Sequence, residues 1–107
     1  MLRIKELQEQ VKQLLDEKGF RYDKGVFWEK IALTHTEISE LADVIKKQGY
    51  DAREKIAEEI ADIIIRAMNF GLMFDIDVEE AIKKKMEFNF TRPRKYNTYE
   101  GKSDNGV

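Results

Sequence analysis

Residues 35–64, HTEISELADVIKKQGYDAREKIAEEIADII, decide the fold. Apolar residues recur every three or four positions on both sides of the central QGYD, which is the period of an amphipathic α-helix. Two lysines before Gly49 suit a helix C-terminus, and Asp51 followed by Glu54 has the spacing of a capping box that opens a new helix. The stretch therefore predicts two helices joined by a short turn, and such helices pack as antiparallel neighbours.

The same signals place the other helix boundaries. A first helix begins near residue 3 and ends at Gly19, and the hairpin helices run from about residue 26 to 48 and from Asp51 as N-cap to about residue 73. A last helix opens at Asp77 and ends before Pro93. Strand alternation is nowhere sustained. We expect an all-α fold, a compact four-helix bundle-like domain over residues 1–97, followed by a polar tail at 98–107.

Composition excludes several classes of function. The 107-residue chain has no cysteine, which removes disulfides, zinc-thiolate sites and thiol chemistry and is consistent with a reducing compartment. Charged residues make up 37% of the chain but leave a net charge of only -2, so binding to nucleic acid is not expected. No apolar run approaches the roughly 18 residues of a membrane span. The sequence predicts a cytoplasmic protein without a membrane segment.

Four acids stand beside the apolar positions of the hairpin. Glu37 and Glu40 border the apolar face of the first hairpin helix. On the second, otherwise apolar helix the polar residues fall within an arc of about 80°: Glu59, Asp62, Arg66 and Asn69. Residues 37 and 62 are equidistant from the junction of residues 49 and 50, and so are residues 40 and 59. An antiparallel hairpin therefore places the four carboxylates at one height, facing each other.

Such a cluster repels itself unless cations are present. Oxygen ligands without histidine or cysteine suit Mg²⁺ or Mn²⁺, and Mg²⁺ keeps coordination positions open for phosphates, which points to phosphoryl chemistry on a nucleotide. Either acid pair alone also has an ordinary structural interpretation, since ExxE is common on charged helices and Asp62 has the i, i+4 spacing of a salt bridge to Arg66. The mirrored placement of the two pairs favours a metal site.

The motif resembles a known family. Glu37-Ile-Ser-Glu40, an 18-residue gap and Glu59-Ile-Ala-Asp62 resemble the ExxE, spacer, ExxD signature of MazG-like all-α nucleoside triphosphate pyrophosphohydrolases. FWEKIALTHTEISELAD, residues 27–43, is similar to the segment that leads into the first acidic pair of that family. Further matches, over roughly residues 20–97, are an asparagine after the second pair and a K, N, RP pattern in the last helix: Asn69, Lys85, Asn89 and Arg92-Pro93.

The resemblance implies Mg²⁺-dependent hydrolysis of a nucleoside triphosphate, deoxy or noncanonical forms included, to a monophosphate and pyrophosphate, often as house-cleaning of noncanonical or surplus nucleotides. It implies a homodimer or homotetramer whose sites involve more than one chain. In this interpretation the four acids are the catalytic metal ligands, with Mn²⁺ as an alternative ion. Asn69, Lys85, Asn89 and Arg92 contact the substrate.

Other interpretations stay open. The basic end of the last helix also fits a solvated terminus that complements the helix dipole. A non-catalytic helical oligomerisation or interaction module is the rival from another class, and a phosphoribosyl-ATP pyrophosphohydrolase is the rival within related folds. A di-iron carboxylate bundle is excluded, because it needs Glu-x-x-His and Ala32 stands three residues before His35, the single histidine.

Overall fold

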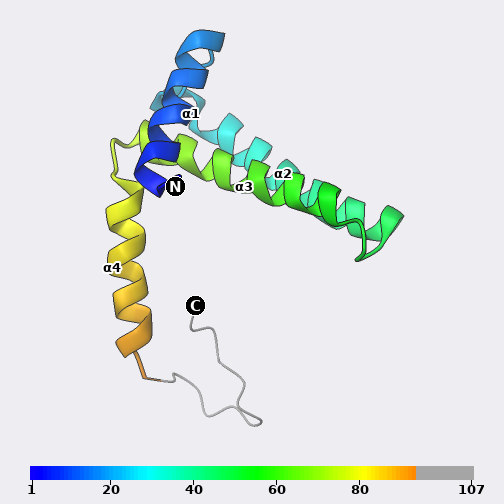
Figure 1. Cartoon of the computed structure of the whole chain (residues 1–107). Coiled ribbons are helices and arrows are strands. Elements are labelled where there is room, and N and C mark those ends of the chain that lie inside the picture. The colour runs from blue at the N-terminus through cyan, green and yellow to red at the C-terminus, as the bar shows by residue number, and fades with distance from the viewer. Residues whose placement is uncertain (94–107) are drawn as a thin grey trace.

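The computed structural model of the chain describes residues 1–93. It contains α1 (Ile4–Lys18), the short 3₁₀ helix η1 (Lys24–Val26), α2 (Phe27–Gln48), α3 (Arg53–Met73) and α4 (Val78–Thr91) (Figure 1). The described part of the chain has no β-strand. The predicted all-α fold with four α-helices is confirmed, whereas the predicted tail at 98–107 lies outside the described residues.

Most of the predicted helix ends are confirmed. Gly19 ends α1 in the left-handed conformation with φ 74°, and Gly49 follows α2 with φ 85°. The Asp77 side chain caps α4 by accepting a hydrogen bond from the Glu80 N–H at 3.1 Å. The predicted cap at Asp51 is wrong. Ala52 is the N-cap of α3, and Asp51 sits in the turn, where its carbonyl accepts a hydrogen bond from the Arg53 N–H.

The helices α2 and α3 form an antiparallel hairpin, and α1 packs across the end of this hairpin that is remote from its turn (Figure 1). The buried core lies at that end, where Val11 and Leu15 of α1 meet Met68 of α3. Gly71 permits the close approach there, because a Cβ at this position would overlap Val78 and come within 2.9 Å of the Gln8 side chain. The helix α4 leaves the same end and packs against α1. The hairpin is therefore anchored at one end only.

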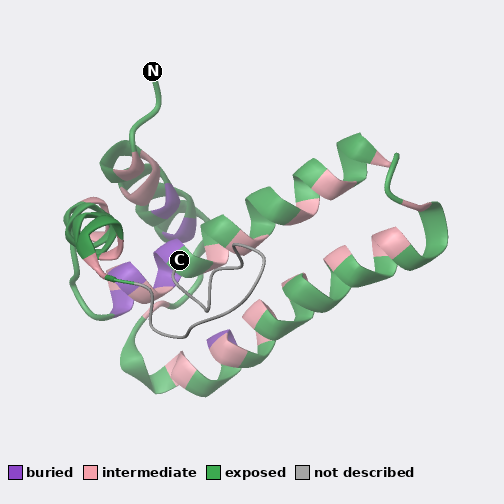
Figure 2. Cartoon of the chain, turned by 90° about the horizontal axis from the view of Figure 1, so that it is seen from below, coloured by how far each residue is buried: buried purple, intermediate pink, exposed green. Residues whose placement is uncertain are grey.

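The arm formed by α2 and the first half of α3 is incompletely covered. The exposed fraction of the residue is 51% for Ile38, 46% for Ile60 and 45% for Ile64. Figure 2 shows exposed and half-buried residues along both helices, with the buried ones gathered mainly where α1 meets α3. The otherwise apolar helix α3 is therefore only partly covered in one chain. No helix within residues 1–93 has the length and apolar character needed to cross a bilayer.

Candidate metal centre

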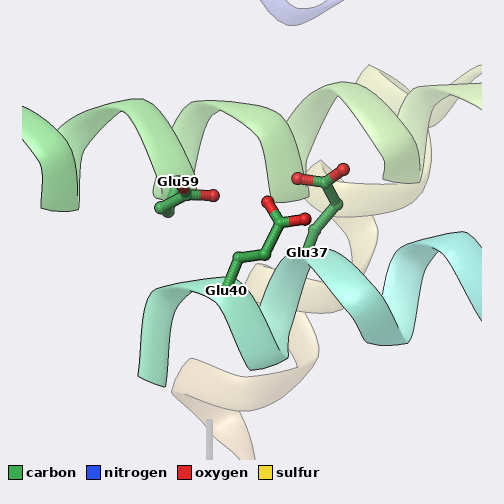
Figure 3. Close-up of side chains that lie close together, drawn as sticks. All are labelled: Glu37, Glu40 and Glu59. Atoms are coloured by element: carbon green, nitrogen blue, oxygen red, sulfur yellow. The ribbon is translucent and has the colours of Figure 1, made fainter. Parts of the chain in front are cut away.

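The hairpin brings three of the four predicted acids together. Glu37 and Glu40 project from α2 toward Glu59 on α3 (Figure 3), and one carboxylate oxygen of each lies within 4.8 Å of the other two. Glu37 and Glu40 share a face of α2 because residues three apart on a helix are neighbours. Glu59 reaches them because the short turn at Gly49 and Tyr50 sets the register of α3. The geometry expected from the spacing is confirmed for these three side chains.

Two oxygens of the cluster have no partner in the described structure. The Glu37 side chain is only 12% exposed, and Oε2 of Glu37 and Oε2 of Glu59 are both buried without a hydrogen bond. Buried carboxylate oxygens are normally paired, because an unpaired one loses its hydration without compensation. Converging hard oxygen donors are the ligands that Mg²⁺ and Mn²⁺ prefer. The residues present therefore fit a hard divalent cation.

The pKa of Glu59 reflects its burial and the acids close to it. Burial raises the pKa of the Glu59 carboxyl, and the negative charges of Glu40, Asp62 and Glu37 raise it further. Both effects disfavour the ionised form of Glu59 in the metal-free protein. A divalent cation between these carboxylates would act in the opposite direction, since it favours the ionised forms.

Arg66 provides the one ion pair made by this cluster within residues 1–93. Its Nε lies 3.5 Å from Oε1 of Glu37, with the Arg66 side chain 27% exposed. The local Asp62–Arg66 salt bridge, considered from the sequence as the ordinary explanation, is absent from the described region. The guanidinium of Arg66 offsets part of the negative charge of the cluster, while Oε2 of Glu37 remains without a partner.

Asp62 is placed close to the cluster but outside the group of three. It is exposed, lies one turn beyond Glu59 on α3, and contributes no atom to the converging oxygens. It does line a cavity shared with Glu37. Asp62 and Glu37 therefore line one cavity, but Asp62 does not belong to the group of three converging carboxylates.

This cavity has a volume of about 400 Å³ and lies between α1, α2 and α3. Its walls are partly apolar, with Leu14 of α1 and Ile65 of α3 among them, and its volume is in the range of small-molecule sites. Asn69, a predicted substrate-binding residue, lines it and is 3% exposed with Oδ1 unpaired. Lys30 lines it too. Lys30 was not predicted from the sequence, although its seven-residue distance from Glu37 places both on one face of α2.

The three predicted substrate contacts of the last helix do not line this cavity in one chain. Lys85 and Arg92 lie over the ring of Phe88, with Nζ at 5.1 Å and the guanidinium carbon at 5.4 Å from its centroid. Oδ1 of Asn89 is buried without a hydrogen bond among the described residues. The helix α4 packs on α1 and extends away from the hairpin of α2 and α3 (Figure 1).

The raised pKa of Glu59 predicts how stability depends on pH without metal. Above its ordinary pKa of about 4.5, the unfolded chain releases the Glu59 proton while the folded protein still holds it, so the contribution of Glu59 to the free energy of unfolding falls as pH rises through this window. Glu59→Gln removes this loss. We expect the melting temperature of Glu59→Gln at pH 7 without divalent ions to exceed that of the wild type, with little difference at pH 4.5.

The matched control for that measurement is Glu58→Gln. Glu58 is an exposed neighbour whose carboxylate pairs with Lys55 at 3.4 Å, outside the cluster. A melting temperature of Glu59→Gln at or below the wild-type value at pH 7 would contradict the electrostatic account.

Comparison with known families gives one match. The family model described as the MazG nucleotide pyrophosphohydrolase domain matches residues 29–94, a range that includes both acidic pairs. Neither the curated proteins nor the solved structures yielded a match. The matched range covers more than half of the 107 residues and includes all of α3 and α4 and α2 from its third residue on, but not α1. The chain belongs to the MazG nucleotide pyrophosphohydrolase domain family.

Proposed function

We propose that this protein hydrolyses a nucleoside triphosphate, deoxy or noncanonical forms included, to the monophosphate and pyrophosphate, with Mg²⁺ as cofactor and Mn²⁺ as a substitute. The observation that carries the proposal is the convergence of Glu37, Glu40 and Glu59, two of which present a buried oxygen without a partner. Family membership supports the reaction class. Asp62, on the adjoining cavity wall, is the fourth acid of the proposed catalytic set.

The proposed roles follow from position. The acids hold the ion at the mouth of the cavity, and the cavity takes the rest of the nucleotide. When bound, Mg²⁺ supplies neutralisation of the phosphate oxygens and a lowered pKa for water. The oxygen of the attacking water bonds to the α-phosphorus, and a carboxylate of the set accepts the proton that this water loses. The bond between that phosphorus and the bridging oxygen breaks, and pyrophosphate leaves with the electron pair. Asn69 contributes an amide to orient the nucleotide.

We also propose that the active form is a homodimer or homotetramer. Large apolar side chains are exposed on the hairpin arm and on α4, including Ile60, Ile64 and Phe90, the last at 83%. Exposed apolar surface of this extent typically marks an interface between proteins. In the assembly, Lys85, Asn89 and Arg92 of one chain would reach the phosphates held by another. This arrangement would give α4 a role that its position in a single chain does not provide.

The direct test of the reaction is a panel of canonical and modified nucleoside triphosphates, with phosphoribosyl-ATP included, incubated with Mg²⁺ and separated by anion exchange. We expect monophosphate and pyrophosphate from the wild type. Glu59→Gln should lower the rate on the order of 100-fold or more, because charge stabilisation at the phosphates is lost. Glu58→Gln, which alters an adjacent exposed acid, should retain the wild-type rate.

The rival account is a non-catalytic interaction module. It is favoured if no nucleotide is cleaved and Mg²⁺ leaves the melting temperature unchanged. A bound ion would raise the melting temperature, since at 100 times its dissociation constant it stabilises the folded state by about 2.7 kcal/mol. Preferential cleavage of phosphoribosyl-ATP would instead assign the protein to histidine synthesis.

The assembly is tested by light scattering coupled to size exclusion. We expect the mass of two or four chains for the wild type and a shift toward the monomer for Ile64→Glu, which places a charge on the exposed face of α3. Ile76→Ser is the control, since Ile76 is equally exposed at 48% but lies in the loop between α3 and α4. A monomeric wild type at micromolar concentration would rule out the proposed assembly.

A further inference from the structure

Lys30 is buried in the first turn of α2. Only 6% of the residue is exposed, and within residues 1–93 it is the one charged residue in the buried class. Lysines usually bury the carbon stem and leave the ammonium in water. A lysine this buried keeps only part of the hydration of its charge, which is unfavourable unless an opposite charge compensates for the loss.

No carboxylate of the described region forms an ion pair with Lys30. The ion pairs there join other side chains, and the nearest acid along the same face of α2, Glu37, is paired with Arg66. The helix dipole adds to the cost, because the N-terminal turn of a helix carries partial positive charge. Lys30 thus combines burial, the absence of a carboxylate partner and an unfavourable helix position. A residue chosen for stability alone would be apolar here.

Lys30 shares a cavity with one member of the acid cluster. It lines the same space of about 400 Å³ as Glu37, and the other acids of that lining are Glu29 and Asp62. Seven residues separate Lys30 from Glu37, which is close to two helical turns and about 10 Å along the axis. A ligand held by the acids through a cation can therefore extend along α2 to the ammonium.

We propose that Lys30 is a phosphate-binding residue of this site, contacting the part of a polyphosphate chain that lies away from the acid cluster. This inference rests on the proposed function, in which the acids and Mg²⁺ hold phosphate oxygens. The missing counter-charge of Lys30 then arrives with the ligand, whose phosphate is the strong anion in this environment. A neutral base or sugar oxygen would leave the ammonium charge uncompensated. Lys30 accordingly selects ligands with several phosphates over nucleosides and monophosphates.

The proposal predicts opposite effects on stability and binding for Lys30→Met. Methionine keeps the shape of the stem and removes the charge, so the ligand-free protein should melt several degrees higher than the wild type. Binding of inorganic tripolyphosphate with Mg²⁺, measured by calorimetry, should weaken at least about tenfold, as expected for a lost charge-assisted contact. Mg²⁺ affinity should not change. Lys30→Arg, which keeps the charge, should retain most of the tripolyphosphate affinity.

The control is Lys46→Met, because Lys46 is an exposed lysine of the same helix outside the cavity. Tripolyphosphate binding by Lys30→Met at wild-type strength would overturn the proposal and leave the proposed function intact. A variant that melts lower, fails to fold or loses Mg²⁺ binding would assign Lys30 a structural role, which also overturns it. A wild type that binds neither Mg²⁺ nor tripolyphosphate would instead refute the metal site itself.

Discussion

Repulsion between carboxylates across the seam of α2 and α3 is the constraint on which the rest of the structure depends. The turn at Gly49 fixes an antiparallel register, and this register brings Glu40 and Glu37 against Glu59 with oxygens within 4.8 Å. Arg66 offsets only part of the negative charge. The hairpin tolerates the cluster because its other end is anchored by the core at Val11. In the metal-free protein the cluster therefore carries an electrostatic cost, which a divalent cation at this place would lower.

The same trade of stability for binding recurs along the cavity. Lys30 is buried without an acid partner, and Asn69 has a buried carbonyl oxygen without a donor. The hairpin arm has a comparable unfavourable feature, because its apolar residues Ile60 and Ile64 remain exposed in one chain. Each feature is unfavourable in the isolated chain. In the proposed function a cation, a polyphosphate and a second copy of the chain would compensate them.

Much of this was predictable, because it follows from local rules. Periodicity and glycine signals located the helices, and the equal spacing of the acids about the turn predicted the cluster. The remaining features depend on tertiary packing. Asp51 is not the cap because α3 begins one residue later than predicted, with Ala52 at the N-cap position. Arg66 pairs with Glu37 of α2 rather than with Asp62 on its own helix, because the packing of α2 against α3 brings Glu37 within 3.5 Å of the guanidinium. The exposure of Ile64 depends on which elements cover α3, which periodicity along one helix does not specify.

The measurement that tests the central claim most directly is Mn²⁺ binding followed by electron paramagnetic resonance, with Mg²⁺ as competitor. The account predicts that the wild type binds Mn²⁺ and that Mg²⁺ displaces it. Affinity should fall at least about tenfold in Glu59→Gln, since even residues that only support metal ligands have effects of this size. Glu58→Gln should bind as the wild type does. Equal Mn²⁺ affinity in the wild type and Glu59→Gln would contradict the assignment of these acids as a metal site.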